Sequence, residues 1–302
     1  MALCLNCKKQ LTVYQKYLFA KNSKFQNVLS DNRIYQCSSC KLIQANHAKI
    51  DKKKLEDYYK NSYSFHKVTE QKKLRKNTKN IVRGLITLNH LKKYLKNKNQ
   101  NYDFFELGAG YGTTLITLKD YYSNSNIYAS EPGEILHEKV LADEAGKKYD
   151  AIILNHVLEH LVFPHDYIYE LIGKLNKNGI LYIEVPNDND LFLKNKVFNS
   201  PHISFFTLKS SYNFFSRYKN ELDLLEIGTY GDCYRPWSLN YNYKHRKNFL
   251  NRIFYKLNNY VKKFKSSSDA EKNLYSKWSK CSKPDNNINE ERYFLRSILR
   301  KF

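Results

Sequence analysis

The sequence lacks the long apolar segments that mark membrane and secreted proteins. No run approaches about eighteen consecutive apolar residues, so we expect no membrane-spanning helix. The first residues, Met1 to Cys7, have neither the charged start nor the apolar stretch of a secretory signal. A hydrophobic share of 42% still suffices for a buried core, which excludes a disordered chain. We therefore expect a cytoplasmic protein whose six cysteines are thiols or metal ligands and not disulfides.

Acidic residues are scarce relative to basic ones. The chain has 29 Asp and Glu against 51 Lys and Arg, a net charge of +22. Such an excess usually indicates nucleic acid or another anionic surface as a partner. Here the lysines are spread along the chain and not gathered in one tract, which favours a generally basic surface. A nucleic-acid partner is the weaker alternative, and an anionic small molecule such as a sugar nucleotide is compatible with the same charge.

The chain divides into four regions by composition and hydrophobic pattern. Residues 1–50 carry two cysteine pairs, and residues 51–100 are charged and indicate a helical linker, most clearly over residues 68–98. Residues 101–231 alternate short apolar runs with helical stretches, and residues 232–302 form a basic, aromatic C-terminal extension. The alternation predicts βαβ units and an α/β domain with a Rossmann-like parallel sheet. The expected strands are residues 102–107, 126–130, 149–154, 179–185 and 222–227.

A glycine-rich turn follows the first expected strand. Residues 108–112 read Gly-Ala-Gly-Tyr-Gly and lead into a helix, and glycines there allow positive φ angles and a close approach of the backbone to a ligand. The dinucleotide fingerprint is G-x-G-x-x-G, whereas the spacing here is G-x-G-x-G. Glu106 stands just before the turn. A carboxylate there suits a cationic ligand, such as the amino acid part of S-adenosylmethionine, and would repel a pyrophosphate.

A second carboxylate, Glu131, ends the second expected strand. In this position a carboxylate can accept hydrogen bonds from both ribose hydroxyls, a role shared by sites for NAD and for S-adenosylmethionine. Its place after the glycine turn and a strand favours a nucleoside-containing ligand. The alternative is a glycine-rich turn in an unrelated α/β enzyme.

Residues 102–229 resemble the class I S-adenosylmethionine-dependent methyltransferases. Residues 149–161 are similar to the fourth strand of that family and the segment after it, and residues 175–187 are similar to its fifth strand. The resemblance implies S-adenosylmethionine as the cofactor. The implied contacts are Glu106, Gly108, Ala109, Gly110 and Gly112 around the methionine part, Glu131 on the ribose, and Asn155 and His156 near the sulfonium.

The chain departs from this family after the second strand. Only 18 residues separate Glu131 from Asp150, where the family usually has a helix, a third strand and a loop. Residues 138–142 are the candidate for the third strand, and Asp143 would then contact the adenine amino group. Because this stretch is short, an alternative is that the chain is a relative of this family that has lost cofactor binding. It would then be a non-catalytic, zinc-bearing interaction protein.

Two C-x-x-C pairs stand in the first region, at Cys4 and Cys7 and at Cys37 and Cys40, separated by 29 residues. Four thiolates in two such pairs can close a tetrahedral zinc site. A single pair would equally suit a redox dithiol. Because all four ligands would come from the protein, we expect the zinc to be structural.

The cysteine pairs also narrow the family. Residues 35–44 and 55–59 with Tyr63 resemble the zinc-binding N-terminal segment of the deoxysugar C-methyltransferases and their relatives in surface-polysaccharide and antibiotic-sugar pathways. The resemblance implies a sugar or sugar-nucleotide substrate, partly covered by the zinc segment and the helix after it. Residues 232–302 match nothing in that group, so C-methylation and O-methylation both stay open.

Candidate catalytic residues follow the fourth expected strand. Methyl transfer needs an aligned nucleophile and usually a base. We expect His160 to be that base, with Glu159 as its orienting partner or a second base, and the alternative is that His160 caps a helix and packs. Tyr63 is a weaker candidate for a catalytic or substrate contact. His202, at the expected start of a helix, resembles a family position that faces the substrate.

The same region lacks the sequence signatures of two classes of nucleic-acid methyltransferase. Enzymes that methylate exocyclic amines of bases usually carry Pro-Pro-aromatic after an Asp or Asn, whereas this chain has His-Val-Leu after Asn155. Enzymes that attack a pyrimidine carbon use a cysteine, and none stands near this strand. Both absences weaken the hypothesis of a nucleic-acid substrate. An RNA methyltransferase stays as the alternative, because some rRNA methyltransferases also carry an N-terminal zinc knuckle.

Overall fold

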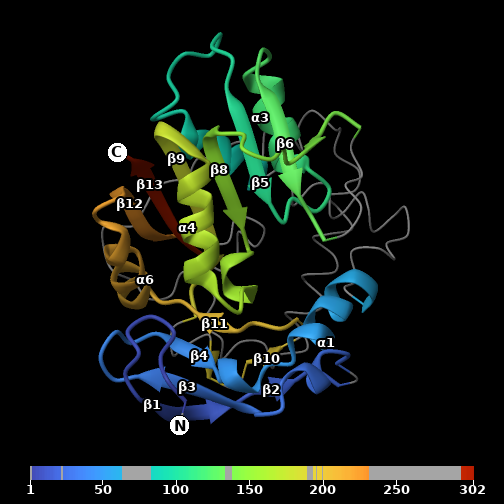
Figure 1. Ribbon diagram of the computed structural model, residues 1–302, viewed down its shortest axis with the longest axis vertical. Helices are drawn as coiled ribbons and strands as arrows, with labels where there is room; N and C mark the ends of the chain where they lie inside the picture. Colours follow the sequence, from blue (N-terminus) through green and yellow to red (C-terminus); the bar gives the residue numbers. More distant parts are fainter. Residues whose placement is uncertain are drawn as a thin grey trace, which may run out of the picture.

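The computed structural model describes residues 2–21, 23–62, 83–132, 138–188, 193–194, 196–198, 200–230 and 294–302. These residues form a large sheet with helices on both faces and a smaller β unit built from the N-terminal residues (Figure 1). The parallel strands of the large sheet point with their carboxyl ends toward the N-terminal unit (Figure 1). Loops that follow these strands therefore lie between the two parts.

The large sheet is mixed, with one antiparallel strand among parallel ones. Pairs β5–β6, β5–β8, β6–β7 and β8–β9 are parallel, whereas β13 is antiparallel to both of its neighbours. The parallel strands have the order of a doubly wound sheet, in which the first of them along the chain lies in the middle and later strands extend to both sides. The antiparallel strand β13 is inserted between β9 and β12. In spatial order the strands are β12 (Leu222–Tyr230), β13 (Phe294–Lys301), β9 (Leu175–Pro186), β8 (Tyr149–Asn155), β5 (Asp103–Leu107), β6 (Asn126–Ser130) and β7 (Leu141–Ala142).

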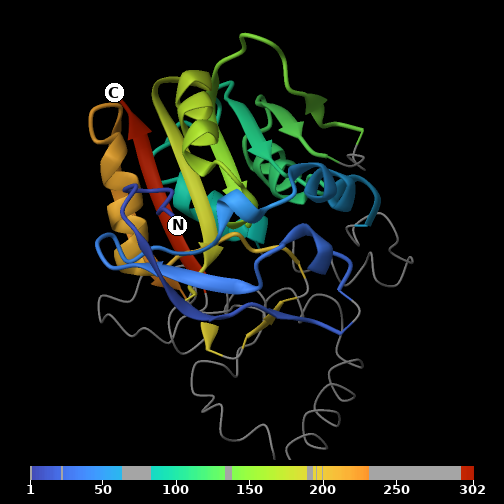
Figure 2. The same cartoon turned by 60° about the horizontal axis from the view of Figure 1, so that its bottom comes forward.

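The position of β13 corrects two expectations from the sequence. A purely parallel sheet ending at residues 222–227 was expected, with everything after residue 231 placed in an extension. Instead, residues 294–301 lie in the sheet between β9 and β12 (red in Figure 2). The strand was missed because it carries Arg296 and Ser297, and a basic segment far from the other strands does not resemble a buried strand. Both side chains are nevertheless buried.

Helices bury both faces of the sheet. One face packs on α3 (Thr113–Tyr121) and on a helix over residues 83–91, which contribute Leu115, Leu118 and Leu91 to the core. The other face packs on α4 (Pro164–Lys174) and α6 (Leu208–Phe215). The strand β8 is buried on both sides because its residues alternate between these two cores. Of the helix expected over residues 68–98, the structure describes the part from residue 83, and helix is present over residues 83–91.

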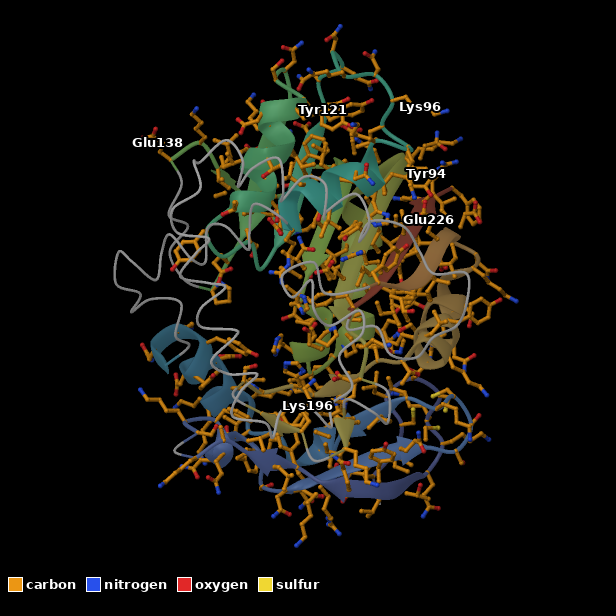
Figure 3. All side chains as sticks on the ribbon, turned by 180° about the vertical axis from the view of Figure 1, so that it is seen from behind. Tyr94, Lys96, Tyr121, Glu138, Lys196 and Glu226 are labelled. Carbon is orange, nitrogen blue, oxygen red and sulfur yellow. The ribbon has the colours of Figure 1, made fainter. Side chains whose placement is uncertain are left out.

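The helix over residues 83–91 and the turn after it are held by two close contacts, one to α3 and one to β12. A Cβ atom on Gly84 would lie 2.5 Å from Oγ1 of Thr117 in α3, so the small residue allows the two helices to approach. At the other end, Glu226 of β12 accepts from Lys93 Nζ at 2.6 Å and from Tyr94 Oη at 2.7 Å. Tyr94 and Glu226 lie side by side in Figure 3. The described part of the expected linker is therefore packed onto the large sheet and α3.

The N-terminal unit shares strands with the rest of the chain. Its sheet has the order β1-β3-β4-β11, and β11 (Ser204–Phe205) comes from the segment after β9. The short strand β10 (Val197–Phe198) likewise pairs with β2 (Leu18–Phe19). Its other elements are β1 (Leu11–Lys16), η1 (Gln26–Val28), β3 (Arg33–Cys37), β4 (Ile43–Ala45), η2 (His47–Lys49), α1 (Lys52–Asp57) and η3 (Tyr58–Ser62). The expected boundary at residue 50 is thus crossed by two strand pairings.

The third parallel strand, β7, has only two residues, Leu141–Ala142, at the end of the expected range. Both are exposed, and β7 forms one edge of the sheet. Residues 133–137 before it lie outside the described part of the chain. Within the residues that the structure describes, no helix is long and apolar enough to cross a membrane.

Candidate functional site

The glycine turn joins β5 to α3 in the conformation that its sequence predicts. Gly108, Gly110 and Gly112 have φ angles of 68°, 56° and 67°, in the left-handed region that favours glycine. A Cβ atom on Gly108 would lie 2.6 Å from Cγ2 of Val157, so a larger residue would clash with the segment after β8. The turn, including Ala109, lies beside the point where β5 and β8 leave the sheet, which is the switch point of a doubly wound sheet.

Glu106 is buried beneath this turn, with 2% of its surface exposed. Its Oε1 accepts a hydrogen bond from Asn155 Nδ2 at 2.9 Å, and its Oε2 has no hydrogen-bond partner among the described residues. Burial raises the pKa of Glu106 to about 8, although the hydrogen bonds from Asn155 and Thr114 act in the opposite direction. A ligand ammonium at Oε2 would supply the missing donor and favour the ionised form.

Glu131 follows β6 and holds the turn from the other side. Its Oε2 accepts the backbone N–H of Gly110 at 2.7 Å. A carboxylate has further lone pairs, so this contact leaves it able to accept from ribose hydroxyls. Glu106 and Glu131 therefore bracket the glycine turn, and the donor set fits a ligand with an ammonium group and a ribose.

Asp143 lies at the end of β7 but its carboxylate is engaged within the protein. Oδ1 accepts from Tyr149 Oη at 2.6 Å, and Oδ2 pairs with Lys174 Nζ at 2.5 Å. Burial opposes ionisation of this carboxyl, but Lys174 and Tyr149 more than offset it and lower its pKa. These contacts tie β7 to β8 and α4. The adenine contact expected at Asp143 stays a prediction.

The two residues expected near the sulfonium point in different directions. Asn155 ends β8 and donates to Glu106, so it belongs to the cofactor side of the site. His156 has a φ angle of 57° and its ring lies between two other carboxylates, Glu159 and Glu184. Of these two residues, Asn155 is therefore the one whose side chain contacts another member of the expected cofactor set.

Glu159 and His160 form a short 3-10 helix, η5 (Leu158–His160), directly after β8. His160 Nδ1 lies 2.6 Å from the carbonyl oxygen of Pro201, so the ring carries its proton on Nδ1 and leaves Nε2 as the acceptor. Nε2 lies 3.8 Å from Glu159 Oε1. Burial opposes ionisation of Glu159, but the hydrogen bond from His156 and the charge of His160 lower its pKa. The pair can therefore take a proton at Nε2 and stabilise the resulting imidazolium.

His202 faces His160, with ring centroids 4.8 Å apart at nearly right angles. Its backbone is fixed by Tyr17, whose hydroxyl lies 3.0 Å from both the N–H and the carbonyl oxygen of His202. The expectation that His202 opens a helix is wrong. It precedes β11, and the next helix, α6, begins at Leu208 after the N-cap Thr207. A strand forms here because β4 offers β11 a pairing edge.

Burial and the neighbouring charges of His160 and Lys196 lower the pKa of His202 well below its usual range, so this ring is neutral. Tyr59 of the N-terminal unit approaches the His160 ring edge-on at 6.1 Å. The two histidines and Tyr59 therefore bring groups from three chain segments to one place. Tyr63, the remaining candidate, lies outside the residues that the structure describes.

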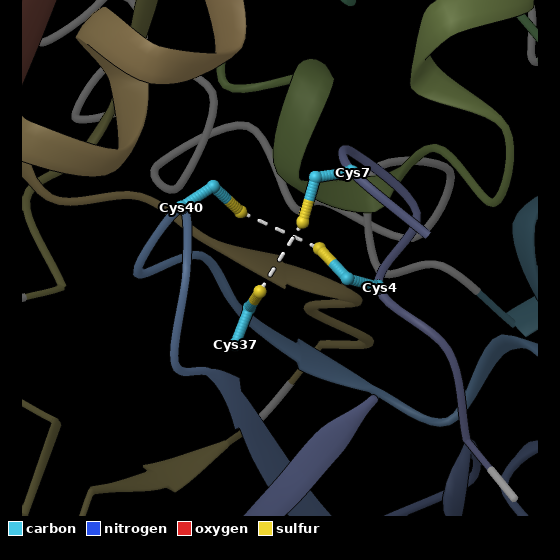
Figure 4. Close-up of side chains that lie close together, drawn as sticks. All are labelled: Cys4, Cys7, Cys37 and Cys40. Atoms are coloured by element: carbon cyan, nitrogen blue, oxygen red, sulfur yellow. Dashed lines mark hydrogen bonds between the residues drawn. The ribbon is translucent and has the colours of Figure 1, made fainter. Parts of the chain in front are cut away.

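The four cysteines of the two C-x-x-C pairs converge in the N-terminal unit (Figure 4). Sγ atoms of Cys4 and Cys40 are 3.4 Å apart, and those of Cys7 and Cys37 are 3.3 Å apart. A tetrahedral zinc with Zn–S bonds of about 2.3 Å needs sulfurs separated by about 3.8 Å, so a small outward shift suffices. The residues therefore fit a zinc ion held by protein ligands alone.

The two cysteine pairs have the same local geometry. Each pair is followed by a lysine with positive φ, Lys8 at 60° and Lys41 at 64°. Each lysine N–H donates to the carbonyl of the first cysteine of its pair, at 2.9 Å and 3.1 Å. Two like turns that present their thiols to a common point could hold a metal ion, whereas a redox dithiol needs only a single pair.

A second group of metal-type ligands comprises Glu159, His160 and His202, whose ligand atoms lie within 4.8 Å of one another. The cations around this group are already paired with carboxylates. His156 donates to Glu159 Oε1, and Lys196 pairs with the neighbouring buried Asp188 at 2.5 Å. Because a divalent cation would have to compete with His156 for Glu159, the one carboxylate of the group, acid–base chemistry suits the group better.

Two charged residues near the site were not found from the sequence. Glu184 of β9 and Arg296 of β13 are buried at 2% and 1% exposure and form an ion pair with Nε and Oε2 2.7 Å apart. Glu184 does interrupt an apolar strand, and a charge in such a run is a signal for a buried partner. The partner itself could not be identified, because it lies on a strand that the sequence did not predict.

With this geometry in place, the chain was compared with known proteins. Residues 80–228 match the family model described as a methyltransferase domain. The doubly wound sheet, the glycine turn and this match define the class: the protein is an S-adenosylmethionine-dependent methyltransferase with a class I fold. No curated protein matches the sequence significantly.

Several solved methyltransferase structures are distantly similar. The plantazolicin methyltransferase BpumL, in complex with a monoazolic desmethylPZN analog and SAH, is 16% identical, with 82% of this chain and 96% of that chain covered and a TM-score of 0.48. Magnesium protoporphyrin IX methyltransferase from Synechocystis PCC 6803 with bound SAH is 12% identical over 83% and 100%, with a TM-score of 0.46. Coclaurine N-methyltransferase bound to N-methylheliamine and SAH is 15% identical over 73% and 70%, with a TM-score of 0.42. These similarities are too distant to indicate a substrate.

Proposed function

We propose that the protein transfers a methyl group from S-adenosylmethionine to a sugar or sugar nucleotide in surface-polysaccharide biosynthesis, such as that of capsule or lipopolysaccharide. The observation that carries the cofactor assignment is the buried Glu106 carboxyl with an unpartnered oxygen beside the glycine turn. The sugar assignment is supported by the four-cysteine unit, which brings Tyr59 and Tyr17 to the His160 and His202 side of the site.

S-adenosylmethionine supplies an electrophilic methyl group on a sulfonium. In the proposed reaction Glu106 holds the ammonium of the methionine part, and Glu131 holds the ribose while fixing Gly110. An acceptor O–H or C–H would lose its proton to Nε2 of His160, and the electron pair of that bond would form the new bond to the methyl carbon. The bond between that carbon and sulfur would break at the same time, its electron pair would go to sulfur, and S-adenosylhomocysteine would leave. Glu159 stabilises the imidazolium of His160, and His202 bounds the acceptor on the opposite side.

We further propose that the four cysteines bind one structural zinc ion. Their convergence in two turns of equal geometry supports this, and a site filled by four protein ligands fits a structural role. Elemental analysis of the purified protein is expected to give one zinc per chain. Absence of zinc after purification without chelator would contradict the assignment.

Transfer of label from S-adenosylmethionine to a panel of nucleotide sugars tests the function. Label is expected in one or more of them, and calorimetry is expected to show micromolar cofactor binding that Gly108→Arg abolishes. Binding without transfer to any glycan precursor would refute the sugar assignment. Absence of binding would favour the non-catalytic alternative.

The same assay, run with and without a chelator after zinc loading, separates acid–base from metal catalysis. The proposed base predicts transfer in the presence of a chelator that leaves the cysteine site filled. Loss of transfer that added Mn²⁺ restores would instead identify Glu159, His160 and His202 as metal ligands.

The net charge of +22 favours RNA as the second candidate substrate. An RNA methyltransferase would bind RNA with an affinity that falls steeply as salt rises. Labelled transfer to total RNA at moderate salt, with none to nucleotide sugars, would replace the sugar proposal with this one.

A further inference from the structure

A chain of buried charges runs from the last strand to the proposed base. Arg296 Nε lies 2.7 Å from Glu184 Oε2, and Glu184 Oε1 lies 3.2 Å from His156 Nε2. His156 Nδ1 in turn lies 3.2 Å from Glu159 Oε1, which is 3.8 Å from His160 Nε2. Positive and negative groups alternate along this path, as in networks whose members strengthen one another.

The backbone of His156 is built to place its ring in this chain. Its φ angle of 57° is uncommon for a residue with a side chain and indicates a local constraint. The backbone N–H donates to the carbonyl of Glu184 at 2.8 Å, so β8 is continued toward β9 for one more residue. Phe294 of β13 covers the ring edge-on at 5.3 Å. The imidazole is therefore held in position from β9 and β13.

Both ring nitrogens of His156 face a carboxylate oxygen at 3.2 Å. A neutral imidazole has one N–H and one lone pair, so it would direct a lone pair at one of the two carboxylates. A doubly protonated ring donates from Nδ1 to Glu159 and keeps its charge within ion-pair distance of Glu184, although Nε2 is not aligned for a hydrogen bond. Burial and the charge of Arg83 oppose protonation, but the two flanking carboxylates more than offset them and raise the pKa of His156 above its usual value.

We propose that His156 is a positioning residue for methyl transfer: clamped as an imidazolium between Glu184 and Glu159, it holds Glu159 as an oriented carboxylate beside His160. This inference rests on the proposed function. It assigns to His156 a role on the acceptor side and not a contact with the cofactor sulfonium.

His156 with its two flanking carboxylates, Glu184 and Glu159, is here called the clamp. The charges around the clamp are balanced by groups on each neighbouring element. Glu184 is also paired with Arg83 of the helix over residues 83–91, at 3.3 Å, and with Arg296 of β13. On the acceptor side, Asp188 and Lys196 pair with each other, and His202 and Tyr59 are the other titratable neighbours of His160. Glu184 therefore has two permanent cations besides His156, whereas His156 is the group that donates to Glu159.

Three variants test the role in a transfer assay. His156→Asn removes the charge with a residue that tolerates positive φ, and kcat is expected to fall about tenfold or more with little change in KM for S-adenosylmethionine. His156→Lys restores the charge in a conformation that Lys8 and Lys41 already adopt, so kcat is expected to recover in part. The matched control is His165→Asn, a histidine of α4 that contacts Tyr218.

The pH profile gives a readout that a purely structural role would not move. Wild-type kcat is expected to fall as pH rises through the raised pKa of His156, because the clamp then loses its charge. This fall in kcat at alkaline pH should be absent in His156→Asn. In His156→Lys it should occur at a higher pH, since a lysine stays charged to about pH 10. An asparagine variant with the wild-type kcat and profile, or a lysine variant no more active than asparagine, would overturn the inference.

A spectroscopic measurement decides the inference without reference to turnover. In protein labelled with ¹⁵N-histidine, a pH titration of the His156 signals, assigned by their loss in His156→Asn, is expected to give a ring pKa above the ordinary histidine value of about 6.5. A ring pKa at or below that value would overturn the proposal. If no acceptor is methylated by the wild type, the proposed function fails, and this spectrum still decides the state of His156.

Discussion

At the scale of single residues, Glu106 and Asn155 illustrate what a sequence can and cannot reveal. The position of Glu106 before the glycine turn predicted a carboxylate for a cationic ligand, and the structure shows that carboxyl buried with one oxygen unpartnered. The contact between Glu106 and Asn155 depends on the register of β5 against β8, which pairs Glu106 with Ile153. A register between distant segments is not encoded in any local pattern, so this contact could not be predicted.

The first prediction concerns cofactor affinity. Glu106→Gln keeps the shape of the side chain but removes the negative charge that would meet the ammonium. The affinity for S-adenosylmethionine is expected to fall about 10- to 100-fold, as for the loss of a charged hydrogen bond of about 1.5–3 kcal/mol. Calorimetry of the purified variant measures it. The control is Glu144→Gln on the exposed stretch after β7, and equal affinity in the two variants would rule out Glu106 as the ammonium partner.

The second prediction follows from the same carboxyl in the cofactor-free protein. Its pKa is raised in the folded state from 4.5 to about 8, so folding favours the protonated form. The stabilisation is complete below about pH 4.5 and is lost as pH rises to about 8. Thermal unfolding should therefore show wild-type stability declining across this window relative to Glu106→Gln. Parallel curves for the two proteins would contradict the raised pKa.

At the scale of elements, the parallel strands were predictable and the closing strand was not. Residues 149–154 and 179–185 are apolar runs of the length and composition of buried strands, and both appear in the sheet. The strand β13 contains Arg296 in a position where a buried strand is normally apolar. Arg296 can be buried there because Glu184 lies opposite it on β9 and pairs with its charge. The two residues are 112 positions apart in the sequence.

The third prediction concerns this ladder pair. Arg296→Met leaves Glu184 buried with less compensation, and the free energy of unfolding is expected to fall by about 3–5 kcal/mol. Arg300→Met on the same strand is the matched control, because Arg300 is only partly buried and should cost well under about 1 kcal/mol. Denaturant unfolding measures the free energy of unfolding of both variants. An equal decrease in the two would show that the buried ion pair contributes no more to stability than the partly exposed Arg300.

At the scale of the whole molecule, the N-terminal unit and the methyltransferase domain are joined through the segment after β9. That segment supplies β10 and β11 to the N-terminal unit and carries His202 between them. The sequence predicted the cysteine site and the α/β domain as separate regions, because each has its own local pattern. It did not predict the shared strands, since pieces of two residues leave no periodicity to detect.

The fourth prediction separates the two parts by their response to metal loss. Removing the proposed zinc with a strong chelator is expected to lower the melting temperature and kcat, since β11 and His202 depend on the N-terminal unit. The affinity for S-adenosylmethionine should change little, because the glycine turn belongs to the other part. Cys4→Ser should reproduce these effects, whereas Cys281→Ser, outside the two pairs, should not. A large loss of cofactor affinity on metal removal would contradict this division.

The order of strands in the sheet also has a consequence for synthesis. The strand β9 is complete at Pro186, but its outer neighbour begins only at Phe294. While the ribosome makes the residues between them, β9 presents an unpaired edge whose side chains include Ile183 and Val185. Such an edge can pair with another chain. Nascent chains stalled before residue 294 should therefore aggregate or recruit chaperones, whereas chains extended past β13 should be released soluble.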